Sequence, residues 1–233
     1  MTLAWLDAST RTARRSPPRS HAIFAALQRD IVLGTLPPQT VLLELHIADH
    51  FGCSQSTVRE ALLRLQEEGL VERQQHRGTI VSECREADAQ ELLRIRHDIE
   101  LRGVRRSLPS YGKNLREALL EDIEAMRRAA RKGDEYEQTA HDRQFHLRLF
   151  EAANLPSVQP VLTRCLLHNH RYKIHNSPPN NTLMESAERH VAIVDALDSG
   201  NLVEVRRSLS HHISTIVEFG PRVIRPFEAE EEA

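Results

Sequence analysis

The sequence of 233 residues has little of what a membrane-spanning or secreted protein requires. No stretch approaches the roughly 20 apolar residues of a transmembrane helix, which excludes a helical membrane span. The N-terminus lacks the apolar segment of a secretory signal peptide, so we expect no export. Only three cysteines occur, Cys53, Cys84 and Cys165, and none belongs to a Cys-x-x-Cys pair. This pattern favours a reducing cytoplasm over a disulfide framework or a thiolate zinc site.

An excess of positive charge, the usual mark of a nucleic-acid-binding protein, is also missing. The chain has 31 Lys and Arg against 33 Asp and Glu, a formal net charge of −2. Divided after residue 82, this charge is +1 in the N-terminal part and −3 in the remainder. Four arginines lie within residues 1–19, which predicts a basic flexible arm or a solubilising tail. The total charge is therefore uninformative about nucleic acid.

A change of pattern near Ser82–Glu86 predicts two domains. Residues 20–82 show three short helical stripes followed by two β-branched segments, which indicate a hairpin. Residues 86–220 are almost entirely helical in pattern, and residues 221–233 form an acidic tail. The predicted fold class is mostly α: an N-terminal winged helix-turn-helix followed by an all-α antiparallel helical bundle of about six helices.

The third predicted helix of the N-terminal domain has two contrasting faces. Its buried stripe consists of Val58, Ala61, Leu62 and Leu65. Ser54 is a natural N-cap, and polar side chains gather near this end, where a helix in the major groove contacts bases. An ordinary helical hairpin with a solvated polar face is the alternative.

Several short strings in this domain match a known pattern. They are Thr57-Val58-Arg59-Glu60-Ala61-Leu62 with Arg64-Leu65, Glu68-Gly69-Leu70-Val71, and Arg77-Gly78-Thr79. Through them the segment from Ser20 to Ser82 resembles the DNA-binding domain of the GntR family of bacterial regulators. The resemblance implies that Arg59 contacts a double-stranded DNA operator, assisted by Ser54, Ser56 and Thr57. Arg77 and Gly78, at the tip of the predicted hairpin, are candidates for a phosphate or minor-groove contact.

Three positions depart from the family pattern. Gln55 replaces the usual arginine, Thr57 the usual proline, and Leu45 a residue that is often basic or polar. A glutamine can bind adenine through two hydrogen bonds, where an arginine would bind guanine. We therefore expect Gln55 to contact DNA within a different operator sequence.

Histidine is abundant, with 13 residues, and three of them fall on predicted inward faces. Asp142 and His146 share one apolar stripe, while His190 and His212 lie on similar stripes of two later helices. An unpaired buried aspartate would cost several kcal/mol, and one divalent cation would satisfy all four side chains. These four residues are therefore the predicted ligands of Zn²⁺, Ni²⁺, Mn²⁺ or Fe²⁺. A buried His–Asp hydrogen-bond network without metal is the alternative.

The strings around these residues also match a known pattern. They are Asp142-Arg143-Gln144-Phe145-His146, Ala153-Asn154-Leu155, Glu188-Arg189-His190 with Ile193, and His212-Ile213. Through them residues 86–220 resemble the FCD ligand-binding domain of the FadR-type branch of the GntR family. The resemblance implies the same four metal ligands, and about six helices instead of seven is closer to the VanR-like subgroup.

The first helix of the predicted bundle carries Arg96-His97-Asp98-Ile99-Glu100. This string resembles an FCD motif in which the arginine often faces a ligand carboxylate, which implies a small organic acid as effector. Alternatively, Arg96 is a surface residue paired with Glu100. A later helix carries His168, His170, Arg171, Tyr172 and His175, whose inward face is ambiguous. We include Arg171 with Arg96 as a candidate effector-binding residue.

Together these features predict a transcription factor, most simply a homodimeric repressor whose operator binding is modulated by a small carboxylate. In one alternative, the protein is a metal sensor and the cation itself is the effector. In another, two His and a carboxylate serve an enzyme, as an iron-dependent facial triad or a hydrolytic zinc site. Nothing in an enzyme explains residues 20–82, so we expect a regulator without catalytic residues.

Overall fold

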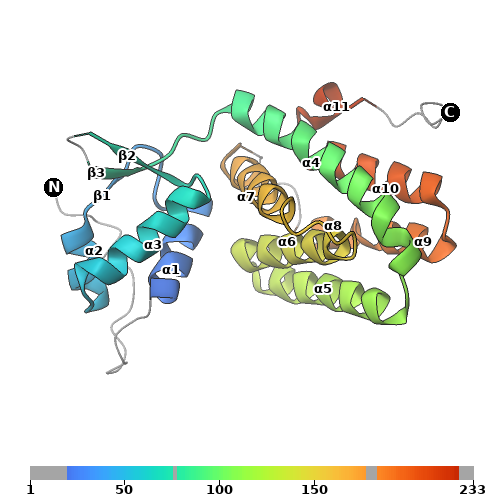
Figure 1. Cartoon of the computed structure of the whole chain (residues 1–233), viewed down its shortest axis with the longest axis horizontal. Helices are drawn as coiled ribbons and strands as arrows, with labels where there is room; N and C mark the ends of the chain where they lie inside the picture. The colour runs from blue at the N-terminus through green and yellow to red at the C-terminus, as the bar shows by residue number, and fades with distance from the viewer. Residues whose placement is uncertain (1–19, 76–77, 177–182, 226–233) are drawn as a thin grey trace. The chain divides into compact units, whose positions relative to one another are not determined.

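The computed structural model describes residues 20–75, 78–176 and 183–225 (Figure 1). It divides into two compact units, Met1–Cys84 and Arg85–Ala233. The arm predicted over residues 1–19, Arg77, and residues 226–233 of the predicted tail lie outside the described residues. None of the described helices combines the length and apolar character needed to cross a membrane.

The N-terminal unit is a winged helix-turn-helix, as predicted. Its elements are α1 (Ser20–Val32), β1 (Val41–Leu42), α2 (Glu44–Phe51), α3 (Gln55–Glu67), β2 (Val71–Gln74) and β3 (Gly78–Val81). The three strands form an antiparallel sheet in the order β1-β3-β2, with Val41 opposite Ile80 and Val71 opposite Val81. Strand β1 was not predicted, because two residues are too short to show an alternating pattern.

The turn between α2 and α3 follows from local chemistry. Gly52 ends α2 in the left-handed conformation, with a φ of 60°, which glycine adopts without steric cost. Two residues later, the Oγ of Ser54 accepts a hydrogen bond from the backbone N–H of Thr57 and caps α3. The predicted N-cap is thus confirmed. Helix α3 then packs its apolar stripe against α1.

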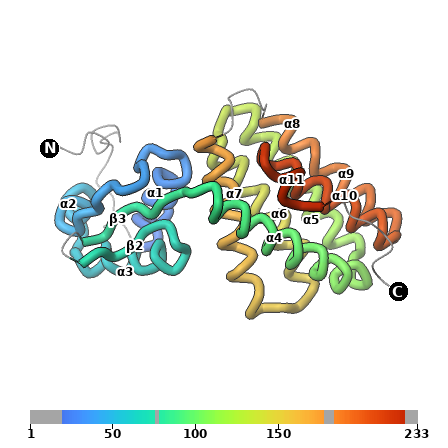
Figure 2. The backbone as a smooth tube through the Cα atoms, turned by 90° about the horizontal axis from the view of Figure 1, so that it is seen from above, coloured from blue at the N-terminus to red at the C-terminus, as the bar shows by residue number. Residues whose placement is uncertain are grey.

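The described residues of the C-terminal unit form helices and the turns that connect them. Its elements are α4 (Glu86–Ser107), the short helix η2 (Leu108–Ser110), α5 (Lys113–Lys132), α6 (Glu135–Glu151), α7 (Gln159–Asn176), α8 (Leu183–Glu188), α9 (Val191–Ser199), α10 (Leu202–Ser214) and α11 (Gly220–Val223). Figure 2 traces the same backbone from above, with α4 beside α10. One predicted helix is divided into α8 and α9, and His190 directly precedes α9 rather than lying within a continuous helix.

The core of this unit is apolar around a polar centre. Leu93 of α4, Phe145 of α6, Ile193 of α9 and Leu209 of α10 are completely buried in one cluster. Charged and polar side chains of α4, α6, α7 and α10 are buried with them. Buried charged groups require partners, because an unpaired charge in an apolar core costs several kcal/mol.

Candidate metal centre and DNA-binding helix

The N-terminal end of α3 is an exposed, polar surface. Ser54, Gln55, Ser56 and Arg59 are exposed, and Thr57 is half-buried. The Oγ of Ser54 lies 2.8 Å from that of Ser56 and 2.9 Å from Oγ1 of Thr57, so three hydroxyls gather at this end. The first turn has no acidic residue to neutralise the helix dipole. The surface is therefore suited to phosphate oxygens.

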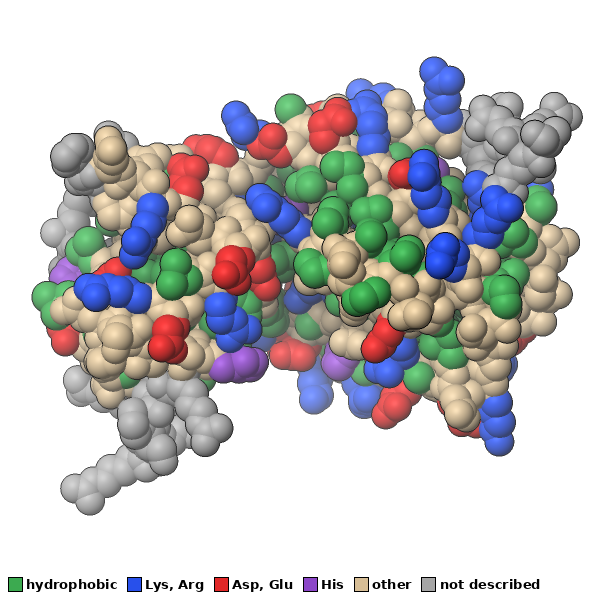
Figure 3. Space-filling model, viewed as in Figure 1, with side chains coloured by type: hydrophobic (Ala, Val, Ile, Leu, Met, Phe, Trp, Pro, Cys, Tyr) green, Lys and Arg blue, Asp and Glu red, His purple; other side chains and the backbone are tan. Residues whose placement is uncertain are grey.

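Arg59 is held by a carboxylate from another helix, a partner that helical spacing in the sequence does not reveal. Its Nε donates to Oε2 of Glu44 at 2.6 Å, and Nη2 of Arg73 lies 3.7 Å from the other oxygen of Glu44. Glu44 thus connects α2, α3 and strand β2. Gly78, at the start of β3, has a φ of 78° and open space around its Cα. Acidic and basic side chains are interspersed on the face drawn in Figure 3.

The four predicted metal ligands meet in the C-terminal unit. Asp142 and His146 come from α6, His190 from the turn before α9, and His212 from α10, and all four are buried. One potential ligand atom of each lies within 4.8 Å of the others. The predicted inward orientation of all four side chains is therefore confirmed.

Distances among these atoms resemble those within a coordination shell. Nε2 of His146 lies 3.2 Å from Nε2 of His212, and Nε2 of His190 lies 3.3 Å from Oδ2 of Asp142. Nε2 of His146 is 3.8 Å from Oδ1 of Asp142. Two ligands about 2.1 Å from one ion are separated by roughly 3.0–3.4 Å at octahedral or tetrahedral angles. Little movement is needed to place a cation among them.

In two of the histidines, the ring nitrogen that points away from the cluster forms a hydrogen bond, and this bond determines which nitrogen carries the proton. Oε2 of Glu100 lies 2.5 Å from Nδ1 of His146. Burial opposes ionisation of Glu100, but His146 and Arg96 outweigh it and lower the pKa of this carboxyl to about 2. An ionised carboxylate only accepts, so Nδ1 of His146 donates. Nδ1 of His190 likewise donates to the carbonyl oxygen of Ser186 at 3.0 Å.

The inward Nε2 of His146 therefore presents a lone pair, which accepts a hydrogen bond from Nε2–H of His212 at 3.2 Å. Burial lowers the pKa of His146 and holds that of His212 well below its ordinary value, so both rings are neutral. Burial opposes ionisation of Asp142, but His170 and His190 outweigh it and place its pKa well below the ordinary value. Nε2 of His190 has no hydrogen-bond partner among the described residues. The Nε2 lone pair of His146, the unpartnered Nε2 of His190 and the carboxylate of Asp142 converge beside His212, so the side chains present fit a divalent metal.

Arg96 is completely buried, so the surface position considered for it is wrong. Its Nε donates to Oε1 of Glu100 at 2.6 Å, as the i, i+4 spacing allows. Its Nη1 and Nη2 have no hydrogen-bond partner in the described part of the chain. Arg171 of α7 is also completely buried. A buried guanidinium with two nitrogens that lack partners has the chemistry needed to bind an anion.

Comparisons with known proteins decide the family. The model of the FCD domain matches residues 91–215, and that of the bacterial regulatory proteins of the gntR family matches residues 19–81. This chain belongs to the GntR family. It is a DNA-binding transcriptional regulator of the GntR–FCD type, and its relatives are regulators of transcription rather than enzymes. The enzyme alternative is therefore wrong.

Curated relatives of this GntR regulator include two repressors. It is 30% identical over 205 residues to the probable D-xylose utilization operon transcriptional repressor of Paenarthrobacter nicotinovorans, covering 88% of each chain. It is 27% identical over 205 residues to the transcriptional repressor RspR of Escherichia coli K12, covering 86% of this chain and 88% of the relative. Among solved structures, E. coli McbR/YncC superposes with a TM-score of 0.71 at 23% identity, covering 90% of this chain and 99% of that one, which shows a shared fold.

His170 belongs to the polar centre of the GntR regulator, although its stripe was ambiguous in the sequence. Its Nε2 lies 3.0 Å from Oδ1 of Asp142, and burial lowers its pKa to about 4. Helix α7 packs against both α4 and α6, so it buries more than one of its faces. No single apolar stripe therefore marks the inward residues of α7.

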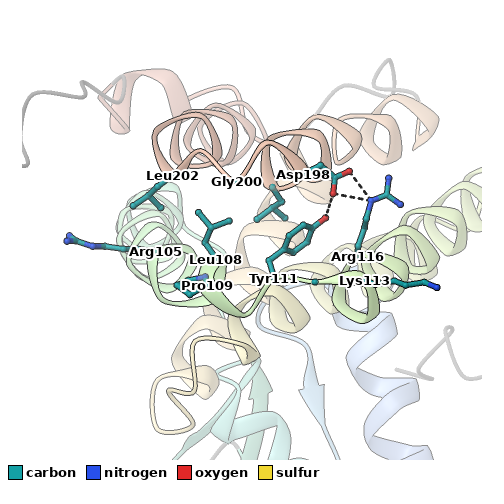
Figure 4. Close-up of a pocket in the computed structure, with 11 residues that line it drawn as sticks. Arg105, Leu108, Pro109, Tyr111, Lys113, Arg116, Asp198, Gly200 and Leu202 are labelled. Carbon is teal, nitrogen blue, oxygen red and sulfur yellow. Dashed lines mark hydrogen bonds and ion pairs between the residues drawn. The ribbon is translucent and has the colours of Figure 1, made fainter.

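A surface pocket of about 650 Å³ lies elsewhere in the C-terminal unit (Figure 4). It is formed by the end of α4, η2, the start of α5 and the turn between α9 and α10. On its wall, Oη of Tyr111 donates to Oδ1 of Asp198 at 2.7 Å, and Nε of Arg116 lies 2.9 Å from Oδ2. None of the predicted metal or effector residues lines this pocket.

Proposed function

We propose that this protein is a repressor whose operator binding is modulated by a small organic acid bound beside a metal in its FCD domain. The observation that carries the proposal is the buried chain of contacts from Arg96 through Glu100 to His146. It joins an arginine with two unpartnered nitrogens to one of four side chains that fit a cation. A receptor for an anion and a receptor for a metal thus share one carboxylate.

On the DNA side, we propose that Arg59 contacts base edges, with Gln55 beside it. Ser54, Ser56 and Thr57 would donate to phosphates at the positive end of α3. We assign Gly78 and Arg77 to a contact from the wing. A homodimer would place two such helices in successive major grooves about one helical turn apart. The repressor relatives support negative control of a metabolic operon.

On the effector side, we propose that Asp142, His146, His190 and His212 hold Zn²⁺, Ni²⁺, Mn²⁺ or Fe²⁺. The bound ion would supply a Lewis-acidic position for a ligand oxygen. Nη1 and Nη2 of Arg96 would bind a carboxylate through two parallel hydrogen bonds, and Arg171 would add positive charge. Because two cationic groups face the effector, an acid is favoured over a neutral sugar. Its binding would shift the population between DNA-competent and incompetent states.

Thermal unfolding of the full-length protein tests this proposal. The metal-depleted protein is measured with Zn²⁺ or Mn²⁺, and then with a panel of small mono-, di- and hydroxycarboxylic acids, with D-xylose as a neutral comparator. DNA selected by the protein from a random pool reports operator release by fluorescence anisotropy. We expect at least one acid to raise the unfolding temperature and release DNA in the presence of metal.

The matched variants are Arg96→Gln and Arg102→Gln, both on α4. Arg102 is 78% exposed and pairs only with Asp98 among the ion pairs described, so its variant should respond as wild type does. Arg96→Gln should keep its metal and lose the acid response. An unchanged acid response in Arg96→Gln would contradict the effector assignment. Loss of operator affinity on metal removal alone, with no acid present, would show that the cation itself is the effector.

A further inference from the structure

The two oxygens of Asp142 face different partners. Oδ2 lies 3.3 Å from Nε2 of His190, one of the four proposed ligands. Oδ1 lies 3.0 Å from Nε2 of His170, within ion-pair distance, and it has no aligned hydrogen bond among the described residues. His170 comes from α7 and is only 2% exposed. His170 is therefore a buried imidazole in contact with the proposed metal ligand set but outside it.

We propose that His170 is a positioning residue: its Nε2–H holds Oδ1 of Asp142 and leaves Oδ2 to coordinate the metal. The inference rests on the metal centre of the proposed function. An ionised carboxylate only accepts hydrogen bonds, so the nitrogen of His170 that faces Asp142 carries the proton. Nδ1 of His170 has no hydrogen-bond partner among the described residues, consistent with a neutral ring that has one N–H.

The geometry favours an outer partner over a fifth ligand. The rings of His146, His190 and His212 lie close together, with centroid separations of 4.4–5.4 Å. His170 instead approaches the carboxylate. Two other ligands have outer partners of the same kind, since Glu100 accepts from His146 and the Ser186 carbonyl accepts from His190. Such partners orient metal ligands, and their loss costs roughly 10–100-fold in metal affinity.

Helix α7 supports the ligand set at a second point. Lys173 lies almost one turn after His170, and its Nζ donates to Oγ of Ser186 at 3.1 Å. The carbonyl of the same Ser186 accepts from His190. One helix thus contacts Asp142 directly and His190 through Ser186. We infer that α7, which supplies none of the four ligands, sets the positions of two of them.

The test compares His170→Gln with His170→Asn in the full-length protein. The Gln amide nitrogen occupies the position of Nε2, whereas the Asn amide is shorter and reaches only the position of Nδ1. Metal affinity is measured by competition with a chromophoric chelator, using Zn²⁺ and Co²⁺ as probes. We expect His170→Asn to lose roughly 10–100-fold in affinity. His170→Gln should stay within a few-fold of wild type.

Exposed His211, which adjoins His212 on α10, provides the control His211→Asn, and its affinity should not change. Circular dichroism of the metal-free proteins checks that each variant folds. Equal affinity of the Asn variant and wild type would overturn the inference. Equal losses in both His170 variants, with an altered Co²⁺ absorption spectrum, would also overturn it, because His170 would then be a ligand itself.

Failure of the proposed function has a separate signature. Asp142→Asn and His190→Ala remove proposed ligands directly. If these two variants bind metal as wild type does, the metal centre itself is wrong. If they lose metal while His170→Asn keeps it, only the role of His170 is wrong.

Discussion

Two polar clusters of this regulator use similar chemistry in opposite surroundings. At the start of α3, Arg59 pairs with Glu44 at 2.6 Å while 54% of the arginine side chain remains exposed. At the centre of the FCD domain, Arg96 pairs with Glu100 at the same distance with no exposure of the arginine. Water solvates Arg59 and Glu44 whether or not they pair, so this pair contributes only about 0–1 kcal/mol to stability.

This difference in solvent exposure has a consequence for mutations. A residue of the exposed cluster can be changed with little effect on stability, whereas a residue of the buried cluster cannot. Arg59 would lose little by exchanging Glu44 for a phosphate or a base, because its pair with Glu44 is already exposed to solvent. The cluster at the FCD centre is shielded from solvent, so its unpartnered polar atoms would destabilise the fold, and a bound cation would remove this cost. We therefore expect changes at Arg59 to affect DNA binding alone, and changes at the FCD centre to affect stability as well.

Metal removal should give the largest effect. Saturating Zn²⁺ at about 1,000 times its Kd should stabilise the protein by about 4 kcal/mol over the chelated form, because only the folded state assembles the site. His212→Ala should abolish this difference. Thermal unfolding with and without chelator measures it, and elemental analysis reports the bound metal. Coincident unfolding curves for wild-type protein in the two conditions would contradict the metal centre.

Arg59→Ala should give the next largest effect, confined to DNA. Loss of a base contact costs about 1–3 kcal/mol, so operator affinity should fall roughly 10–100-fold. Metal content and unfolding temperature should not change, since the side chain is largely exposed. The matched control is Arg59→Lys, which keeps the charge but not the planar guanidinium. It should restore nonspecific DNA binding more than operator preference, and equal operator affinity in all three proteins would refute the assignment.

The contrast between the two clusters also explains what the sequence could predict. Helical spacing shows which face a residue occupies, so the sequence could predict the inward orientation of Asp142 and His146. The residue type before α3 likewise predicted its N-cap. The DNA contacts and the metal remain predictions. The sequence could not predict the burial of Arg96, because its motif is equally compatible with a surface ion pair.

The partners that position these residues come from distant parts of the chain. Glu44 reaches Arg59 across 15 residues, and His170 reaches Asp142 from another helix. Such contacts depend on how helices pack, and a single sequence contains no periodic signal for them. The break between α8 and α9 also has no signal in the sequence, since neither proline nor glycine lies between Glu185 and Ser199.

A packing change tests whether stability of the FCD domain depends on its core as well as its polar centre. A Cβ on Gly103 of α4 would lie 2.5 Å from the ring of Phe150, so Gly103→Ala should destabilise this unit by about 1–3 kcal/mol. Gly112→Ala is the control, because it has open space around its Cα. Chemical denaturation of the metal-free proteins gives both values. Equal stability of the two variants would mean that the aromatic ring moves aside at no cost.

Ser54 gives the smallest expected effect and the sharpest separation of stability from DNA binding. Ser54→Ala removes the hydrogen bond to the N–H of Thr57 and should destabilise the N-terminal unit by about 1 kcal/mol. Ser54→Asp keeps an acceptor at the N-cap and should restore that stability, yet it places a negative charge where phosphates approach. Operator affinity in the Asp variant should therefore fall below that of the Ala variant although its fold is more stable. If affinity instead followed stability in both variants, the hydroxyl of Ser54 would act only as a helix cap.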